Sequence, residues 1–113
     1  MKFRVSILPN AKRDIDRNAL WWAENHSVEQ ALEWSDAVSD QIESLAEFPE
    51  SHGLSTENDV FPYEIRDKLL GLGSRPSYLA VFTIQDGAVC VLAVRRSAQD
   101  TIRPTNIDAL PFV

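Results

Sequence analysis

The side chains best suited to chemistry in this sequence are basic, and they lie in its second half. They are Arg66, Lys68, Arg75, Arg95, Arg96 and Arg103. Guanidinium and ammonium groups bind phosphate, stabilise negative charge that develops in a transition state, or pair with carboxylates. Arg95 and Arg96 end an apolar run, and successive strand residues point to opposite faces of a sheet. The pair therefore offers one cation to each face, for a ligand, for the protein's own acids or for solvent.

Other kinds of chemistry find little support. Cys90 lies inside an apolar run, while His26 and His52 lie in expected turns, so a Cys–His nucleophile is not indicated. Two histidines without cysteine pairs do not form a zinc motif. The glycine-rich stretch Gly71–Pro76 lacks the spacing and the Gly-Lys-Ser/Thr of a phosphate loop. We expect neither a metal nor a cofactor.

Charge is divided unevenly along the chain. The net charge is −6, with 5 basic and 12 acidic residues in positions 1–62 and 6 basic and 5 acidic residues in positions 63–113. A surface this acidic argues against broad nucleic-acid binding, which needs many phosphate contacts. Seven acids lie along one expected helix and its exit: Glu29, Glu33, Asp36, Asp40, Glu43, Glu47 and Glu50. They are spread over a solvent face rather than converging as metal ligands do.

Length and composition indicate one domain over residues 1–113, with a tail from about residue 101. No apolar run approaches the roughly 20 residues that span a bilayer. The first residues lack the apolar length of a signal peptide, and a lone cysteine does not require an oxidising compartment. We expect a cytoplasmic protein that does not interact with membranes.

The first half of the chain predicts a strand and two helices. Residues 3–8 are rich in β-formers, and Pro9 ends the run. Apolar residues then recur at helical spacing from Asn10 to about Asn25. Ser27 with Gln30 forms a capping box that opens a second helix. Its apolar positions extend it to about Glu47, before Pro49; they are Ala31, Trp34, Val38, Ile42, Leu45 and Phe48.

The second half predicts three strands. Residues 51–62 are polar and form a loop, and residues 63–70 form a strand on which Glu64, Arg66 and Lys68 share one face. Asp86-Gly87 then separates two apolar, β-rich runs, which is a strong hairpin signal. Both runs are apolar at odd and even positions alike, as expected of central strands that bury Cys90.

These elements predict an α+β fold, in which an N-terminal strand and an antiparallel helical hairpin pack on a small, mainly antiparallel sheet. The apolar tail residues Leu110, Phe112 and Val113 either close the core or form part of a partner or dimer surface.

Several stretches together resemble one family. They are VSILPNAKRDI, ALEWSDAVSDQIESLAEFPE, YEIRDKLL and SYLAVFTIQDGAVCVLAVRR, followed by Gln99-Asp100. Over residues 3–100 the sequence is similar to the RelE/ParE toxin superfamily, and within it to the ParE-like plasmid stabilisation toxins. The resemblance implies a toxin of a type II toxin–antitoxin module, neutralised by a small antitoxin that is ParD-like or another DNA-binding protein. It also implies a toxin–antitoxin hetero-oligomer or a homodimer.

The same fold carries two activities, because ParE-like members poison DNA gyrase and RelE-like members cut messenger RNA on the ribosome. If the protein were a RelE-like endoribonuclease, the resemblance implies Arg66 and Arg95 as its catalytic residues. No Tyr or His follows Asp100, and a charge of −6 fits poorly with docking into a ribosome. We therefore favour a gyrase-inhibiting toxin that is not an enzyme.

For a toxin of this kind, the residues expected to contact a target or partner are Arg66, Lys68, Tyr78, Arg95 and Arg96. One position departs from the family pattern. Leu79 stands where ParE-like toxins usually carry arginine. This departure leaves a third hypothesis, a weakened or non-toxic module that binds its antitoxin.

Overall fold

The computed structural model describes residues 2–73, 76–96, 104, 107, 108 and 110. The expectations for Arg75, Gln99-Asp100, Arg103, Phe112 and Val113 lie outside the described residues. The helices and strands are, in chain order, β1 (Arg4–Ile7), α1 (Pro9–Asn25), α2 (Val28–Glu43), β2 (Arg66–Leu70), β3 (Tyr78–Gln85) and β4 (Ala88–Arg96).

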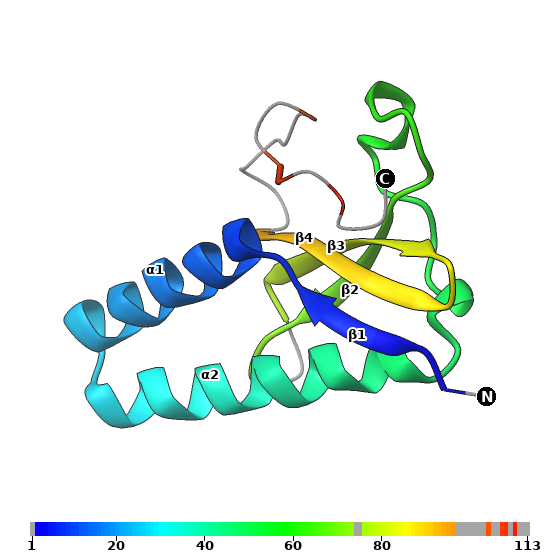
Figure 1. Ribbon diagram of the computed structural model, residues 1–113. Helices are drawn as coiled ribbons and strands as arrows, with labels where there is room; N and C mark the ends of the chain where they lie inside the picture. Colours follow the sequence, from blue (N-terminus) through cyan, green and yellow to red (C-terminus); the bar gives the residue numbers. More distant parts are fainter. Residues whose placement is uncertain (1, 74–75, 97–103, 105–106, 109, 111–113) are drawn as a thin grey trace.

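The strands form one sheet in the order β1-β4-β3-β2. β1 pairs with β4 in parallel, while β3 pairs antiparallel with both β4 and β2. The two helices form a hairpin that packs along the sheet (Figure 1). The predicted α+β fold class and the predicted central position of the last two strands are therefore confirmed.

The hairpin between β3 and β4 follows directly from local chemistry. Asp86 has a φ of 49° and Gly87 a φ of 75°. A two-residue turn of this type needs positive φ at both positions, and Asp-Gly accepts it at little cost. The turn sets the pairing of the two longest strands, as the sequence predicted.

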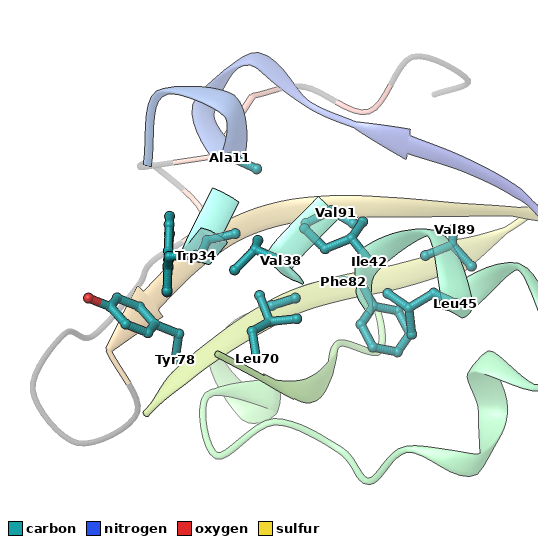
Figure 2. Packing of buried hydrophobic residues seen from close by; sticks show 12 residues of the cluster. Ala11, Trp34, Val38, Ile42, Leu45, Leu70, Tyr78, Phe82, Val89 and Val91 are labelled. Atoms are coloured by element: carbon teal, nitrogen blue, oxygen red, sulfur yellow. The ribbon is translucent and has the colours of Figure 1, made fainter. Parts of the chain in front are cut away.

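One face of the sheet, here called the helix face, holds the larger core. Trp34, Val38 and Ile42 of α2 are fully buried there against Phe82 of β3 and Val91 of β4 (Figure 2). The α2 residues recur every three or four positions, so they form one apolar stripe. Ser27 accepts a hydrogen bond from the backbone N–H of Gln30 at 3.0 Å, which fixes the start of this helix as expected.

The end of the second helix was predicted too late. α2 ends at Glu43, and Ser44–Ala46 form a 3₁₀ turn that keeps Leu45 buried. Phe48 was expected on the core side of the helix, but its side chain is 77% exposed. Pro49 disfavours right-handed helical backbone at Phe48, which has left-handed backbone and so does not continue the helical face.

The strand predicted for residues 63–70 is shorter at its start. Ile65 donates its N–H to Asn58 Oδ1 at 2.9 Å and accepts from the Ser55 N–H at 2.9 Å. These bonds pair the backbone of Ile65 with the preceding connection, so the backbone ladder with β3 begins only at Arg66. Glu64 therefore lies outside the strand, and the predicted shared face holds for Arg66 and Lys68 alone.

In the C-terminal part of β4, side chains instead of a neighbouring strand pair with the backbone on the β1 side. β1 pairs with β4 only as far as Val91, because the chain turns into α1 at Pro9. Beyond that point Asn10 Nδ2 donates to the Leu92 carbonyl at 3.1 Å. Asp14 Oδ2 accepts from the Val94 N–H at 2.9 Å. The first turns of α1 thus satisfy backbone groups that the short strand leaves open.

The face of the sheet away from the helices, here called the far face, is covered by irregular segments. Ile65 and Phe61 from the connection between α2 and β2 bury Cys90 and Leu92 of β4. Leu110 is 7% exposed and belongs to the same cluster. For Leu110, core closure is therefore confirmed.

The tail also completes α1. Asp108 Oδ2 accepts a hydrogen bond from the Asn10 N–H at 2.6 Å, whereas Leu8 at the N-cap offers no side-chain acceptor. A carboxylate at a helix N-terminus also stabilises the helix dipole.

Within the described residues, no helix is both long and apolar enough to cross a bilayer.

Replacing Asp14 with Ala should lower the free energy of unfolding by about 1–3 kcal/mol, because the buried Val94 N–H loses its acceptor. Urea unfolding measures the change. The matched control is Asp16→Ala on the exposed side of the same helix, expected within about 0.5 kcal/mol of the parent. Equal effects of the two substitutions would contradict this role of Asp14.

Candidate partner-binding site

Arg95 lies on the far face in a cluster of buried charges. Its Nη2 is 3.1 Å from Glu57 Oε2 and 3.9 Å from Asp67 Oδ2. The side chains of Arg95 and Glu57 are only 7% and 10% exposed. Arg95 is opposite Leu79 in the sheet register, and Asp67 is opposite Val81, so the guanidinium reaches across β3. Arg95, which was expected to contact a partner, thus pairs with two acids of its own chain.

Burial dominates the acid chemistry of this cluster. It raises the pKa of Asp67 above its ordinary range, and the negative charge of Glu57 acts in the same direction. The side chain of Ser55 and the guanidinium of Arg95 oppose that shift by stabilising the charged form. The net direction is upward, so desolvation outweighs the compensation that the ion pair provides.

Arg96 points to the opposite face, as the strand alternation predicted. Its guanidinium carbon lies 4.8 Å from the centroid of the Trp21 ring of α1. Such a cation–π contact contributes about 0.5–1 kcal/mol at a partly exposed site. Arg96 therefore joins the end of β4 to the end of the helical hairpin while keeping part of its surface in solvent.

Arg66 holds the connection that follows α2. Its Nη1 donates to the carbonyl of His52 at 2.5 Å and to that of Glu50 at 3.4 Å. Its Nη2 is 3.5 Å from the exposed carboxylate of Glu64. The side chain of Arg66 is 22% exposed, so the charge is mostly used within the chain.

Lys68 shares the helix face of β2 with Arg66 and is partly exposed. Burial is the largest cause that lowers the pKa of His52, and the positive charges of Lys68 and Arg66 lower it further. A lowered pKa keeps the imidazole neutral at physiological pH. His52 also packs edge-on against Phe82, with ring centroids 5.9 Å apart. The sequence did not bring these three residues together, because His52 is in an irregular segment whose path local patterns do not define.

Tyr78 and Leu79 lie on opposite faces of β3. Tyr78 is 2% exposed and packs at 5.0 Å, ring to ring, against Trp34, so it belongs to the core. Leu79 is partly exposed and lies beside Arg95 on the far face. The position where the resemblance expects arginine is therefore next to the Glu57–Arg95–Asp67 cluster. The contribution of these residues to partner or target binding stays a prediction.

The described residues contain no group of three His, Cys, Asp or Glu side chains placed to hold a metal ion. The acids of α2, from Glu29 to Glu43, are exposed. Burial raises the pKa of the Cys90 thiol, which disfavours a reactive thiolate. The cations of β2 and β4, which lie on both faces of the sheet, stay the predicted partner-binding residues.

Comparison with known proteins identifies the family. Residues 5–101 match the family model described as the ParE toxin of the type II toxin–antitoxin system parDE. The chain belongs to the ParE toxin family. A search of curated proteins finds no match.

Among solved structures, the toxin resembles a chain described as the chromosomal ParDE TA system from P. aeruginosa. The TM-score is 0.69 and the sequence identity is 18%, over 84% of this chain and 96% of the other. At that identity the likeness supports the fold. It agrees with the strand-first arrangement of a helical hairpin on a mixed sheet.

Replacing Arg95 with Ala should cost about 3–5 kcal/mol of unfolding free energy, because it leaves the mostly buried carboxylates of Glu57 and Asp67 without their cation. The neighbouring Arg96→Ala removes a cation from the same strand end and should cost about 1 kcal/mol. Chemical denaturation of both variants tests this. Similar small losses would contradict a structural role for the buried ion cluster.

The raised pKa of Asp67 predicts an unusual dependence on pH. The native state binds a proton more tightly than the unfolded state, so this contribution to stability is present below about pH 4 and is lost as pH rises through the folded pKa. The difference in unfolding free energy between the parent and Asp67→Asn should therefore fall from pH 4 to pH 7. Urea titrations across that range measure it. Leu69→Ala on the same strand adds no titrating group and should give a constant difference.

Proposed function

We propose that this ParE family member is a non-enzymatic toxin that inhibits DNA gyrase and is neutralised by a cognate antitoxin. The family match over residues 5–101 carries the proposal. A gyrase poison needs a surface that binds a protein target, whereas an RNase needs free cations around a scissile phosphate. The proposal places the protein in the cytoplasm, where gyrase acts.

The contacts of Arg66 and Arg95 within the chain support a protein-binding toxin over an RNase. Cleavage of RNA requires charge stabilisation at the phosphate and groups that move protons. Arg95 is buried against Glu57 and Asp67, and Arg66 donates to two carbonyls of its own chain. Neither guanidinium is presented to a phosphate in this arrangement. Lys68 and Arg96 are partly exposed, so they are better placed than the buried Arg95 to meet a protein target.

One observation favours the alternative, a RelE-like messenger RNA endoribonuclease. His52 has a lowered pKa next to the charges of Arg66 and Lys68, and a neutral imidazole is suited to accept a proton. Addition of the purified toxin to a translating extract separates the two activities. We expect intact messenger RNA; cleavage that His52→Ala abolishes would establish the RNase and overturn gyrase inhibition as the primary function.

A third hypothesis, an antitoxin-binding module without toxicity, rests on Leu79. An apolar side chain at this position presents no charge to a target. Expression of the toxin gene alone distinguishes it from a gyrase poison. Growth arrest with DNA damage signalling is expected for the poison, whereas normal growth with retained antitoxin binding would establish the harmless module.

Substituting Lys68 with Ala should weaken inhibition of gyrase supercoiling about tenfold, the effect of one lost charge contact at a protein interface. Thermal stability should change little, because Lys68 is partly exposed. The control is Lys12→Ala on the exposed side of α1, which should inhibit like the parent. Equal inhibition by parent and Lys68→Ala would place the target surface elsewhere.

A further inference from the structure

Phe48 combines two properties that are unusual for a phenylalanine. It is 77% exposed, and its backbone has φ 53° and ψ 45°, in the left-handed region. Single exposed apolar residues are common and need no explanation. A bulky residue in left-handed backbone is a genuine outlier, and such outliers gather at functional sites.

The backbone shape is needed, but the phenyl ring is not. The Phe48 carbonyl accepts from the Ser51 N–H at 3.0 Å and from Ser51 Oγ at 2.7 Å, which closes the turn after the 3₁₀ segment. Asn or Gly would adopt the same backbone at lower cost. The ring belongs to neither buried apolar cluster. The sequence thus keeps an aromatic residue where the fold favours a small or polar one.

The chain that directly follows Phe48 is held against the fold. Pro49 is buried. Arg66 donates to the carbonyls of Glu50 and His52, so the connection is fixed to the edge of the sheet. An exposed aromatic ring on a rigid support loses little conformational entropy on binding, which is the property of an interface anchor.

The charges around the turn define the chemistry of its partner. Glu43, Glu47 and Glu50 are exposed near it in the sequence. Arg66 also reaches the turn, but its side chain is only 22% exposed and its Nη1 donates to the carbonyls of Glu50 and His52. Glu47 Oε1 is 3.8 Å from Lys2 Nζ, in an ion pair between two exposed side chains. An acidic surface repels nucleic acid and anionic lipid, and it repels a second copy that presents the same surface. It favours a polypeptide with Lys or Arg next to apolar residues.

We propose that Phe48 anchors the cognate antitoxin, with its ring covered by apolar side chains of a basic antitoxin segment that pairs with Glu47 and Glu50. This inference rests on the proposed neutralisation by an antitoxin. It adds a defined contact on the turn after α2, which Arg66 of β2 supports from within the chain. Antitoxin binding then explains why a strained aromatic residue is kept in an exposed turn.

The test uses the full toxin and the purified antitoxin encoded beside its gene. Phe48→Asn should bind that antitoxin about 10- to 100-fold more weakly in calorimetry, as expected for loss of an aromatic anchor. Its Tm should rise by about 4 °C, because Asn accepts left-handed backbone. A simple folding defect would lower both the antitoxin affinity and the Tm. A lower affinity together with a higher Tm therefore identifies a residue whose role is binding.

Two controls make the result specific. Leu20→Asn replaces a residue that is 59% exposed on α1, and it should leave antitoxin affinity unchanged. The double variant Glu47→Gln/Glu50→Gln should weaken binding and reduce its dependence on salt. An equal loss for Leu20→Asn would overturn the proposal, because it would show a general effect of exposed apolar surface.

Separate readouts distinguish this inference from the proposed function. If the parent binds antitoxin and Phe48→Asn binds it equally well, the anchor is wrong while neutralisation stands. If the parent does not bind antitoxin at all, both fail. If Phe48→Asn keeps full antitoxin affinity but no longer inhibits gyrase, the ring belongs to the target surface and the proposal is overturned.

Discussion

The arrangement of this toxin depends on satisfying β4. The strand runs through the middle of the sheet, and eight of its nine residues are buried. Buried backbone donors and acceptors must be paired, yet the parallel partner β1 is only four residues long. Asn10 and Asp14 supply the missing partners from the start of α1. The position of the helical hairpin is thereby fixed by hydrogen bonds to the sheet as well as by apolar packing on α2.

A second constraint is the desolvated charge on the far face. Arg95, Glu57 and Asp67 come from three distant parts of the chain, and each is expensive to bury without the others. Their association places the long connection between α2 and β2 over the sheet. The two arginines at the end of β4 therefore differ in character. Arg95 organises the far face, and Arg96 remains partly exposed at the hairpin.

Local patterns predicted the elements, and tertiary contacts determined the rest. The Asp86-Gly87 turn and the Ser27 cap depend on a few adjacent residues, so their types and positions were correct. The partners of Arg95 lie 28 and 38 positions away, and no spacing rule connects them. Phe48 continued the apolar helical spacing, but α2 ends at Glu43 and Phe48 has left-handed backbone. The apolar spacing therefore did not predict that Phe48 is exposed.

The structure distinguishes two surfaces, the cations of β2 and β4 and the turn at Phe48, which the sequence did not distinguish. Cations on β2 and β4 were the conspicuous feature, but burial and internal hydrogen bonds use much of their charge. The sequence did not predict the strained turn at Phe48, because Phe48 fits the apolar spacing of the second helix. Binding surfaces are selected against alternatives that would fold better, so a residue that opposes local backbone preference is informative about a partner. By that criterion Phe48 carries a stronger functional signal than Arg95, whose burial follows from the stability of the fold.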